Sequence, residues 1–426
     1  MSKLTFELVC VDCRTVYPGL EARCRCECGG TLDVVHDLEA VATAVSRDTF
    51  DNRRGSSDAL DRSGVWRFRE LILPVEQGQA VTRGEGNTHL YDAPAVAEYT
   101  GMKRLSLKHE GENPTGSFKD RGMTVGTTAA RLLGMQRVAC ASTGNTSASM
   151  ASYAATAGMR AFVFIPEGNI ALGKLSQALA YGARTLQLAG DFDAAMRIVE
   201  QVCAREDIYL LNSINPFRIE GQKAIGFELL QDLEWRVPDW IVLPGGNLGN
   251  NSAIAKGLME LHELGWIDAL PRIAVIQATG ANPLYTAFRT GQPVQPVEAD
   301  TIATAIRIGN PVSWKKSLRG IEALDGIVEQ VTDQEILDAK AQVDAAGIGA
   351  EPASCATVAG LRKLVASGTI DPDSRVCGVL TGHLLKDPDV VVGYHTGTLD
   401  GIDSNHANPP LSVPDDLDAI LAELRR

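Results

Sequence analysis

From residue 85 onward, short apolar segments alternate with loops of small polar residues and with helical patterns, and this alternation constrains the fold more than any other feature. The predicted strands are 137–141, 161–165, 185–188, 209–211, 240–243, 273–277 and 376–380. Strands that alternate with helices favour an α/β fold, in which parallel sheets are covered by helices on both faces. Binding sites of such folds lie at the carboxyl ends of the strands. The polar sequences that follow Ala141, Leu211, Leu243 and Leu380 are therefore candidate functional segments.

The chain length of 426 residues exceeds what one hydrophobic core usually supports, so we expect two domains and an appendage. The sequence pattern also changes along the chain, from a Cys-rich start to a mixed polar region and then to the strand–helix alternation. The predicted parts are a ribbon-like segment at 1–35, a large domain from 36–105 and 223–400, a small mobile domain at 106–222, and a C-terminal tail with a short helix at 401–426.

The net charge of −13 argues against a nucleic-acid partner, because such a partner requires a basic surface. The acidic balance does not exclude an anionic substrate, since a few donors at helix N-termini can bind a phosphate. No apolar run approaches the roughly eighteen residues that span a bilayer. The N-terminal sequence has no long apolar region or cleavage site. We therefore expect a cytoplasmic protein without a membrane partner.

Five of the nine cysteines lie between residues 10 and 28, which suggests either a structural zinc site or plain thiols. A zinc ribbon would use Cys10, Cys13 and two of the three later cysteines. We take Cys26 and Cys28 as that second pair, while Cys24 stays an alternative. The spacing of the later cysteines is irregular, because none of them forms a second C-x-x-C motif.

The segment ENPTGSFKDRG, residues 112–122, places Lys119 where a loop becomes a helix. Pro114 and Gly116 interrupt regular structure, Ser117 is a natural N-cap, and a helix is predicted over 120–133. The positive end of a helix dipole disfavours the charged form of a nearby lysine. A lysine that is neutral part of the time can attack an aldehyde, so Lys119 is a candidate for covalent cofactor attachment.

Two further segments join a predicted strand to a predicted helix. PGGNLGN, residues 244–250, combines glycines with a helix N-terminus, which is the composition of an anion-binding loop. It matches neither the dinucleotide-binding nor the nucleoside-triphosphate-binding glycine motif. STGNTSAS, residues 142–149, offers small hydroxyl and amide groups that suit a carboxylate.

Together these segments resemble the fold-type II pyridoxal phosphate (PLP) enzymes, and within them most closely the threonine synthases. The resemblance extends from about Glu85 to Lys386 and includes two departures, His89 and Leu384, where relatives commonly carry Pro and Gly. It implies a tryptophan synthase β-like fold with two doubly wound parallel-sheet domains and the site between them. The matching segments are 112–122, 142–149, NSINPFRIEGQK (212–223), 244–250, TIATAIRIGNP (301–311), EPAS (351–354) and TGHLLKDP (381–388).

The resemblance also implies a role for each site residue. Lys119 would hold PLP and act as the acid and base of the reaction, Asn145 would donate to the cofactor's 3′ oxygen, and Thr381 would face its pyridine nitrogen. The phosphate of PLP would be held by Gly246, Asn247, Leu248, Gly249 and Asn250. The substrate's carboxylate would be held by Ser142, Thr143 and Thr146, and its phosphate by Asn212, Ser213 and Arg218. His383 beside Thr381 is expected to pack or to hydrogen-bond rather than to act as a base.

The implied reaction is the conversion of O-phospho-L-homoserine and water into L-threonine and phosphate, with a homodimer as the family expectation. One alternative is another fold-type II reaction, such as threonine or serine dehydration, or a cysteate synthase-like β-replacement on phosphoserine. A different alternative is a zinc-ribbon module for nucleic acid, which the charge of −13 disfavours.

Overall fold

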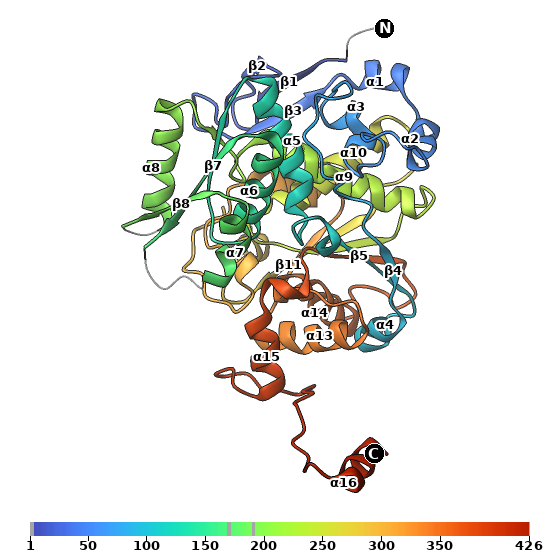
Figure 1. Cartoon of the computed structure of the whole chain (residues 1–426). Helices are drawn as coiled ribbons and strands as arrows, with labels where there is room; N and C mark the ends of the chain where they lie inside the picture. The colour runs from blue at the N-terminus through green and yellow to red at the C-terminus, as the bar shows by residue number, and fades with distance from the viewer. Residues whose placement is uncertain (1–3, 168–171, 190–191, 426) are drawn as a thin grey trace.

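The computed structural model describes residues 4–167, 172–189 and 192–425, and its strands form three separate sheets. A six-stranded sheet and a four-stranded sheet make up the body, and a small antiparallel sheet of the N-terminal residues lies on top of them (Figure 1). No helix in the described ranges combines the length and apolar character required to cross a membrane.

The six-stranded sheet is parallel except for the edge strand β4, which pairs antiparallel with β5. Its two faces follow from the alternation of side chains along each strand. Ile241 and Leu243 of β10 pack into one apolar cluster, whereas Trp240 and Val242 pack into another on the opposite face. The strands in spatial order are β12 (Ile327–Val331), β11 (Arg272–Ala278), β10 (Trp240–Pro244), β13 (Val376–Leu380), β5 (Leu105–His109) and β4 (Leu90–Asp92).

Helices cover both faces of this sheet, which is the arrangement that parallel strands require. One face packs on α9, α10 and α12, and the other on α4, α13 and α14. The helices are α4 (Pro94–Thr100), α9 (Pro216–Asp232), α10 (Gly249–Glu263), α12 (Trp314–Ala323), α13 (Asp333–Ala345) and α14 (Pro352–Ala366).

The four-stranded sheet is entirely parallel and is flanked by the helices that alternate with its strands. In Figure 1, α8 lies at its outer edge. The strands in spatial order are β8 (Arg184–Leu188), β7 (Arg160–Pro166), β6 (Arg137–Ala141) and β9 (Tyr209–Leu210). The helices are α5 (Lys119–Leu132), α6 (Asn145–Ala157), α7 (Leu172–Ala180) and α8 (Phe192–Arg205).

Helix α9 connects the two sheets, since it follows the last strand of the smaller sheet and packs against both α5 and α10. Its residues from Pro216 to Gln231 are buried. Asn215 caps its N-terminus by accepting a hydrogen bond from the backbone N–H of Phe217 over 3.1 Å, which satisfies an otherwise unpaired donor.

The N-terminal sheet is docked by a buried hydrogen bond and a buried ion pair. His36 Nε2 lies 3.0 Å from Glu220 Oε2 of α9, and Lys316 of α12 lies 2.8 Å from Asp33. Its strands are β1 (Phe6–Cys10), β2 (Val16–Pro18) and β3 (Leu32–His36), in the order β2-β1-β3.

The remaining helices are short, and α16 lies well away from the body (Figure 1). They are α1 (Leu38–Ala44), α2 (Arg47–Arg54), α3 (Arg69–Ile72), α11 (Pro283–Thr290), α15 (Pro388–Thr396), α16 (Leu417–Leu424), and the short 3-10 turns Trp66–Phe68, Glu110–Glu112, Thr304–Ile306 and Leu384–Lys386.

The predicted strands and the predicted α/β class are confirmed, with differences of one or two residues at the strand ends. The predicted N-cap is wrong. Helix α5 begins at Lys119 after Phe118, and the side chain of Ser117 is buried without a hydrogen-bond partner. The reason is that Ser117 forms an isolated antiparallel bridge with Gly382, so its backbone is extended rather than turned towards the helix. Strand β5 crosses the boundary predicted at residue 105 and pairs with β13, so we propose that the small domain begins after His109.

Candidate active site

A cavity of about 1550 Å³ lies between the two body sheets, at the carboxyl ends of β6, β10 and β13. Polar segments that follow separate strands meet there, as the alternating pattern predicts. Arg218 alone among the predicted cofactor- and substrate-binding residues does not line it. The predicted residues that do line it are Lys119, Ser142, Thr143, Asn145, Thr146, Asn212, Ser213, Gly246, Asn247, Leu248, Gly249, Asn250 and Thr381.

Lys119 is the first residue of α5 and lines this cavity. Burial and the nearby guanidinium of Arg218 lower the pKa of Lys119 to about 7, and the carboxylate of Glu351 opposes this shift. The Nζ atom lies 4.2 Å from the centre of the Phe118 ring. At neutral pH a substantial fraction of this lysine is therefore an uncharged amine, the form that acts as a nucleophile and a base.

The loop before Lys119 is attached to the end of β13. The backbone N–H of Phe118 donates to the carbonyl of Thr381 over 3.0 Å. Ser354 Oγ accepts the N–H groups of Thr381 and Gly382 at 2.8 and 2.9 Å and lies 3.0 Å from Thr381 Oγ1. Because both lone pairs of Ser354 are used, its hydrogen is the one available for Thr381 Oγ1. The Thr381 hydroxyl is then left free to donate into the cavity.

The loop 244–250 has the geometry of an anion-binding site. Leu248 has a positive φ of 63°, and a Cβ atom on Gly246 would lie only 3.0 Å from the Cα atom of Ile306. Helix α10 begins at Gly249, so the first N–H groups of the helix face the loop. Both polar side-chain atoms of Asn250 are buried without a partner. Such orphaned groups require a ligand to satisfy them, and the loop fits a phosphate.

The segment after β6 presents hydroxyl and amide groups around the N-terminus of α6. Asn145 is the first residue of this helix, and its Nδ2 donates to Glu351 Oε2 over 3.0 Å. Ser142 Oγ accepts from the backbone N–H of Gly144 over 3.2 Å. Thr146 is buried and lines the cavity. The chemistry of this segment fits a carboxylate, which accepts hydrogen bonds from N–H groups and hydroxyls.

In the segment 212–218, two of the three residues predicted to bind the substrate's phosphate make hydrogen bonds to the backbone instead. The Asn212 amide accepts from Ala141 N over 2.9 Å and donates to Ala141 O over 3.0 Å, so it is already occupied by β6. Arg218 donates from Nη1 to Leu211 O over 3.0 Å, while its Nε and Nη2 are buried without a partner. Burial lowers the Arg218 pKa to about 10. Of the three residues predicted to bind the substrate's phosphate, only Ser213 lines the cavity with a side chain that is not engaged in the hydrogen bonds to the backbone described above.

Glu351 and Lys386 are among the ionisable side chains that line the cavity without an assigned role in the sequence interpretation. Glu351 is the N-cap of α14, and burial raises its pKa. Lys386 donates to the side-chain carbonyl of Gln177 on α7, and burial lowers its pKa. Glu351 lies in the segment EPAS and Lys386 in TGHLLKDP, so the resemblance of these segments to the family could have identified both residues as part of the site. His383 accepts a hydrogen bond from Leu385 N at 3.2 Å, consistent with the predicted hydrogen-bonding role.

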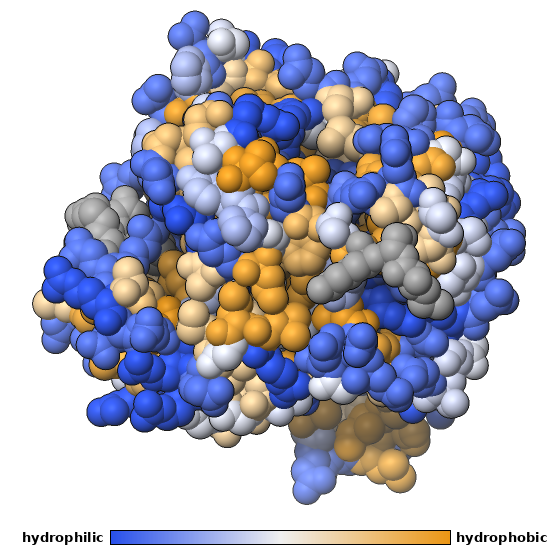
Figure 2. Space-filling view, turned by 90° about the horizontal axis from the view of Figure 1, so that it is seen from above, coloured by the Kyte–Doolittle hydropathy of each residue, from blue (hydrophilic) through white to orange (hydrophobic). Residues whose placement is uncertain are grey.

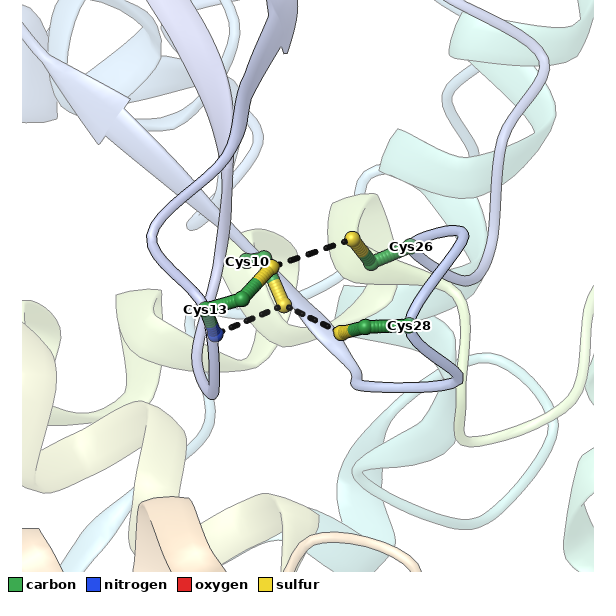
Figure 3. Close-up of side chains that lie close together, drawn as sticks. All are labelled: Cys10, Cys13, Cys26 and Cys28. Atoms are coloured by element: carbon green, nitrogen blue, oxygen red, sulfur yellow. Dashed lines mark hydrogen bonds between the residues drawn. The ribbon is translucent and has the colours of Figure 1, made fainter.

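The N-terminal cysteines form a second cluster. One sulfur atom from each of Cys10, Cys13, Cys26 and Cys28 lies within 4.8 Å of the others. Figure 3 shows the four side chains converging from two loops, with Cys10–Cys28 and Cys13–Cys26 sulfur distances of 3.5 Å. Cys24 is not part of the cluster, because its sulfur faces the carbonyl of Leu210 at 3.8 Å. Four thiols at this spacing are the donor set of a tetrahedral zinc site.

Residues 81–382 match the family model described as "Pyridoxal-phosphate dependent enzyme", and the chain belongs to this family. Within it the chain groups with threonine synthases. It is 50% identical over 393 residues to "Threonine synthase" of Methanosarcina acetivorans, covering 91% of this chain and 94% of the relative. It is 47% identical to "Threonine synthase" of Methanocaldococcus jannaschii, covering 90% and 93%. It is 39% identical to "Threonine synthase 2, chloroplastic" of Arabidopsis thaliana, covering 91% and 78%.

Solved structures with similar folds are more distant in sequence. Maize serine racemase superimposes with a TM-score of 0.62 at 20% identity, covering 80% of this chain and 94% of that one. The processed threonine deaminase isoform 2 of Solanum lycopersicum gives a TM-score of 0.61 at 19% identity, covering 72% and 87%. At these identities the likeness concerns the fold, and it confirms the predicted fold-type II architecture.

Proposed function

We propose that this chain is a threonine synthase, which converts O-phospho-L-homoserine and water into L-threonine and phosphate with the help of PLP. The observation that carries the proposal is the position of Lys119. A lysine with a pKa of about 7 lines a cavity that is also lined by the anion-binding loop 246–250 and by Thr381, whose hydroxyl hydrogen is available to a ligand. The threonine synthase relatives cover nine-tenths of the chain, which supports the same reaction.

The residues present fit PLP. Lys119 would hold its aldehyde carbon, the 246–250 loop its phosphate, Asn145 its 3′ oxygen and Thr381 its pyridine nitrogen. When bound, PLP supplies an electron sink for negative charge at the substrate's α carbon. The hydroxyl of Thr381 would donate a hydrogen bond to that nitrogen without delivering a full proton, which would favour elimination and replacement over transamination.

The chain's own groups then carry the proton transfers. The uncharged Nζ of Lys119 would accept the proton from the substrate's Cα and pass it on to the bound cofactor. The nitrogen, uncharged again, would then accept the proton from Cβ before phosphate leaves from the γ position. The same nitrogen would give a proton to Cγ, which becomes the methyl group, and a proton to Cα when the hydroxyl group of water adds at Cβ. The remaining proton of that water leaves with the phosphate, so the proton transfers balance. One group can serve both directions because its pKa lies close to neutral pH. Ser142, Thr143 and Thr146 orient the substrate through its carboxylate.

The phosphate of the substrate would be bound by Ser213 and by the two unpaired nitrogen atoms of Arg218, Nε and Nη2. Since Arg218 lies behind the cavity wall, this contact requires the smaller sheet and its helices to close on the ligand. Closure would also exclude stray water from the site. Asn212 would act indirectly, by holding β6 and the 212–218 segment together.

The test is to supply the purified chain with O-phospho-L-homoserine and to quantify phosphate and threonine in the same reaction. Equal yields of the two products would support the synthase. Phosphate accompanied by 2-oxobutyrate would indicate elimination without productive addition of water. If phosphohomoserine is not consumed, the alternatives are serine or threonine dehydration and β-replacement on phosphoserine with sulfite, each tested with its own substrate.

We also propose that Cys10, Cys13, Cys26 and Cys28 hold one structural zinc ion. The convergence of the four sulfur atoms supports this, together with the tight turn in which Gly29 N donates to Cys26 O over 2.9 Å. Elemental analysis of the purified chain should find one zinc per chain, and the Cys13→Ser and Cys28→Ser variants should contain less. The matched control is Cys24→Ser, which should keep its zinc.

We further propose a cytoplasmic homodimer. Reduced cysteines throughout the described chain suit a reducing compartment. Figure 2 shows a hydrophobic patch in the middle of the face seen from above. In addition, Leu417 and Leu424 of the C-terminal helix α16 are 70% and 77% exposed. Large exposed apolar surface is typical of an interaction site. Light scattering should give twice the mass of the chain.

A further inference from the structure

The N-terminal ribbon reaches the active-site cavity through one side chain. Arg25 lines the cavity, although every other described lining residue lies at or after Gly111. Its Nη2 atom is 3.3 Å from Glu200 Oε1 of α8, and its Nη1 donates to Gly29 O over 3.3 Å. The Arg25 and Glu200 side chains are 42% and 34% exposed, so this ion pair is solvent-screened and contributes little stability. Its guanidinium is therefore free to exchange Glu200 for a stronger anion.

Arg25 is held in place from both sides. On one side is Cys24, whose sulfur lies 3.8 Å from Leu210 O and 3.9 Å from Asn215 Nδ2. Asn215 caps α9, the helix that carries Arg218 in its first turn. On the other side is Cys26, one of the four clustered thiols.

The backbone around Arg25 is also ordered. Arg25 forms an isolated antiparallel bridge with Thr31, and Cys26 N donates to Gly30 O over 2.9 Å. Arg25 is joined by a peptide bond to a residue of the thiol cluster. The short loop around Arg25 therefore connects the thiol cluster, through Cys26, to the 212–218 segment, through the contact of Cys24 with Asn215.

We propose that Arg25 binds the phosphate group of the substrate at the mouth of the cavity, and that the metal-binding cluster of the ribbon positions Arg25 for this role. A chain with a net charge of −13 needs local cations to attract a dianion, and Arg25 offers a planar guanidinium that can bind phosphate through two N–H groups. The identity of the substrate rests on the proposed function, whereas the binding of phosphate does not.

The experiment compares Arg25→Ala and Arg25→Lys with a matched control, Arg23→Ala. Arg23 belongs to the same ribbon, but it pairs with Glu21 at 2.8 Å, lies over Tyr17 and does not line the cavity. Calorimetry measures the affinity of the PLP-loaded enzyme for inorganic phosphate, and steady-state assays give KM and kcat for O-phospho-L-homoserine. We expect Arg25→Ala to weaken phosphate binding and raise KM, each by about tenfold, with a much smaller change in kcat. Arg25→Lys should retain part of the affinity, and Arg23→Ala should behave as the parent chain.

The link to the ribbon is tested with Cys13→Ser. This variant should lose zinc and raise KM to a similar extent, and it should add little when combined with Arg25→Ala. Unchanged phosphate affinity and KM in Arg25→Ala would overturn the proposal for Arg25. Additive effects in the double variant would overturn the link to the metal site. If the parent chain binds phosphate through Arg25 but does not consume phosphohomoserine, the proposed function fails while this inference stands.

Discussion

The side-chain amide of Asn145 donates a hydrogen bond to the carboxylate of Glu351 over 3.0 Å, across the cavity between the two sheets. Asn145 opens α6 beside the smaller sheet, and Glu351 caps α14 on the larger one. One N–H of the amide is therefore fixed by Glu351, which leaves the other to point at a ligand. Glu351 also lies close enough to Lys119 to raise that lysine's pKa against the effect of burial.

We predict that Glu351→Gln and Glu351→Ala separate these two effects. The glutamine keeps an oxygen for Asn145 but removes the charge, so the pKa of Lys119 should fall and the pH dependence of kcat/KM should move to lower pH. The alanine removes the hydrogen bond as well, and kcat/KM should fall by about a further tenfold. Steady-state profiles from pH 5 to 10 measure both. Identical profiles for the parent and both variants would contradict the positioning role.

Replacing Lys119 by Ala should abolish threonine formation, because the only other described lysine that lines the cavity, Lys386, donates to the side chain of Gln177. Mass spectrometry after borohydride reduction should find PLP attached to the parent chain but not to the variant. Lys103→Ala is the control, since Lys103 is exposed and pairs with Asp373 at 2.7 Å. Threonine synthesis retained by Lys119→Ala would refute the proposed mechanism.

The stability of the apoenzyme should depend on pH through Lys119. Its pKa is about 7 in the folded chain and 10.5 for an ordinary lysine, so the folded chain binds fewer protons between these values. Folding is therefore disfavoured by this group below pH 7, and the penalty disappears as the pH rises towards 10.5. Lys119→Met removes the group, so it should raise the Tm of the apoenzyme more at pH 6 than at pH 9. A pH-independent change in Tm, followed by circular dichroism, would contradict this.

The network of buried ion pairs around Glu228 should contribute strongly to the stability of the fold. Glu228 accepts from Arg121 and Lys108, each at 2.8 Å, and all three side chains are almost fully buried. Glu228→Ala would remove the carboxylate that these two cations share, leaving Arg121 with Glu110 and Lys108 with Asp232, and we expect a loss of about 3–5 kcal/mol in the free energy of unfolding by urea. The control is Asp373→Ala at an exposed pair, where the loss should stay below about 1 kcal/mol. Equal losses in the two variants would show that burial of the network is unimportant.

Local patterns were sufficient to predict the strands that carry the site, because each combines an apolar run with a polar turn. Strand β5 was not predicted, since its sequence LSLKH contains Lys108 and His109. Lys108 is buried only because Glu228 and Asp232, far along the chain, neutralise it at 2.8 and 2.7 Å. No local pattern can reveal such a partner.

The same limit applies at the site. Spacing alone did not decide between Cys24, Cys26 and Cys28, because the choice depends on the turn that directs Cys26 and Cys28 back towards Cys10. The N-cap assigned to Ser117 failed for a related reason, since its backbone pairs with Gly382 from a distant strand end. Residues whose role depends on a short sequence segment were predictable, and those that depend on a tertiary partner were not.

The docking of the ribbon sets the smallest part of this chain that can fold. The family model covers residues 81–382, but a fragment cut to those limits would lack Asp33 and His36. Lys316 would then lose its carboxylate partner, and Glu220 would face solvent among cations arranged for a covered site. The apolar side chains Leu8, Leu32 and Val34, which belong to the main core, would be missing as well. The family's shared segment is thus shorter than the cooperative unit, and truncations for expression should keep the first 36 residues.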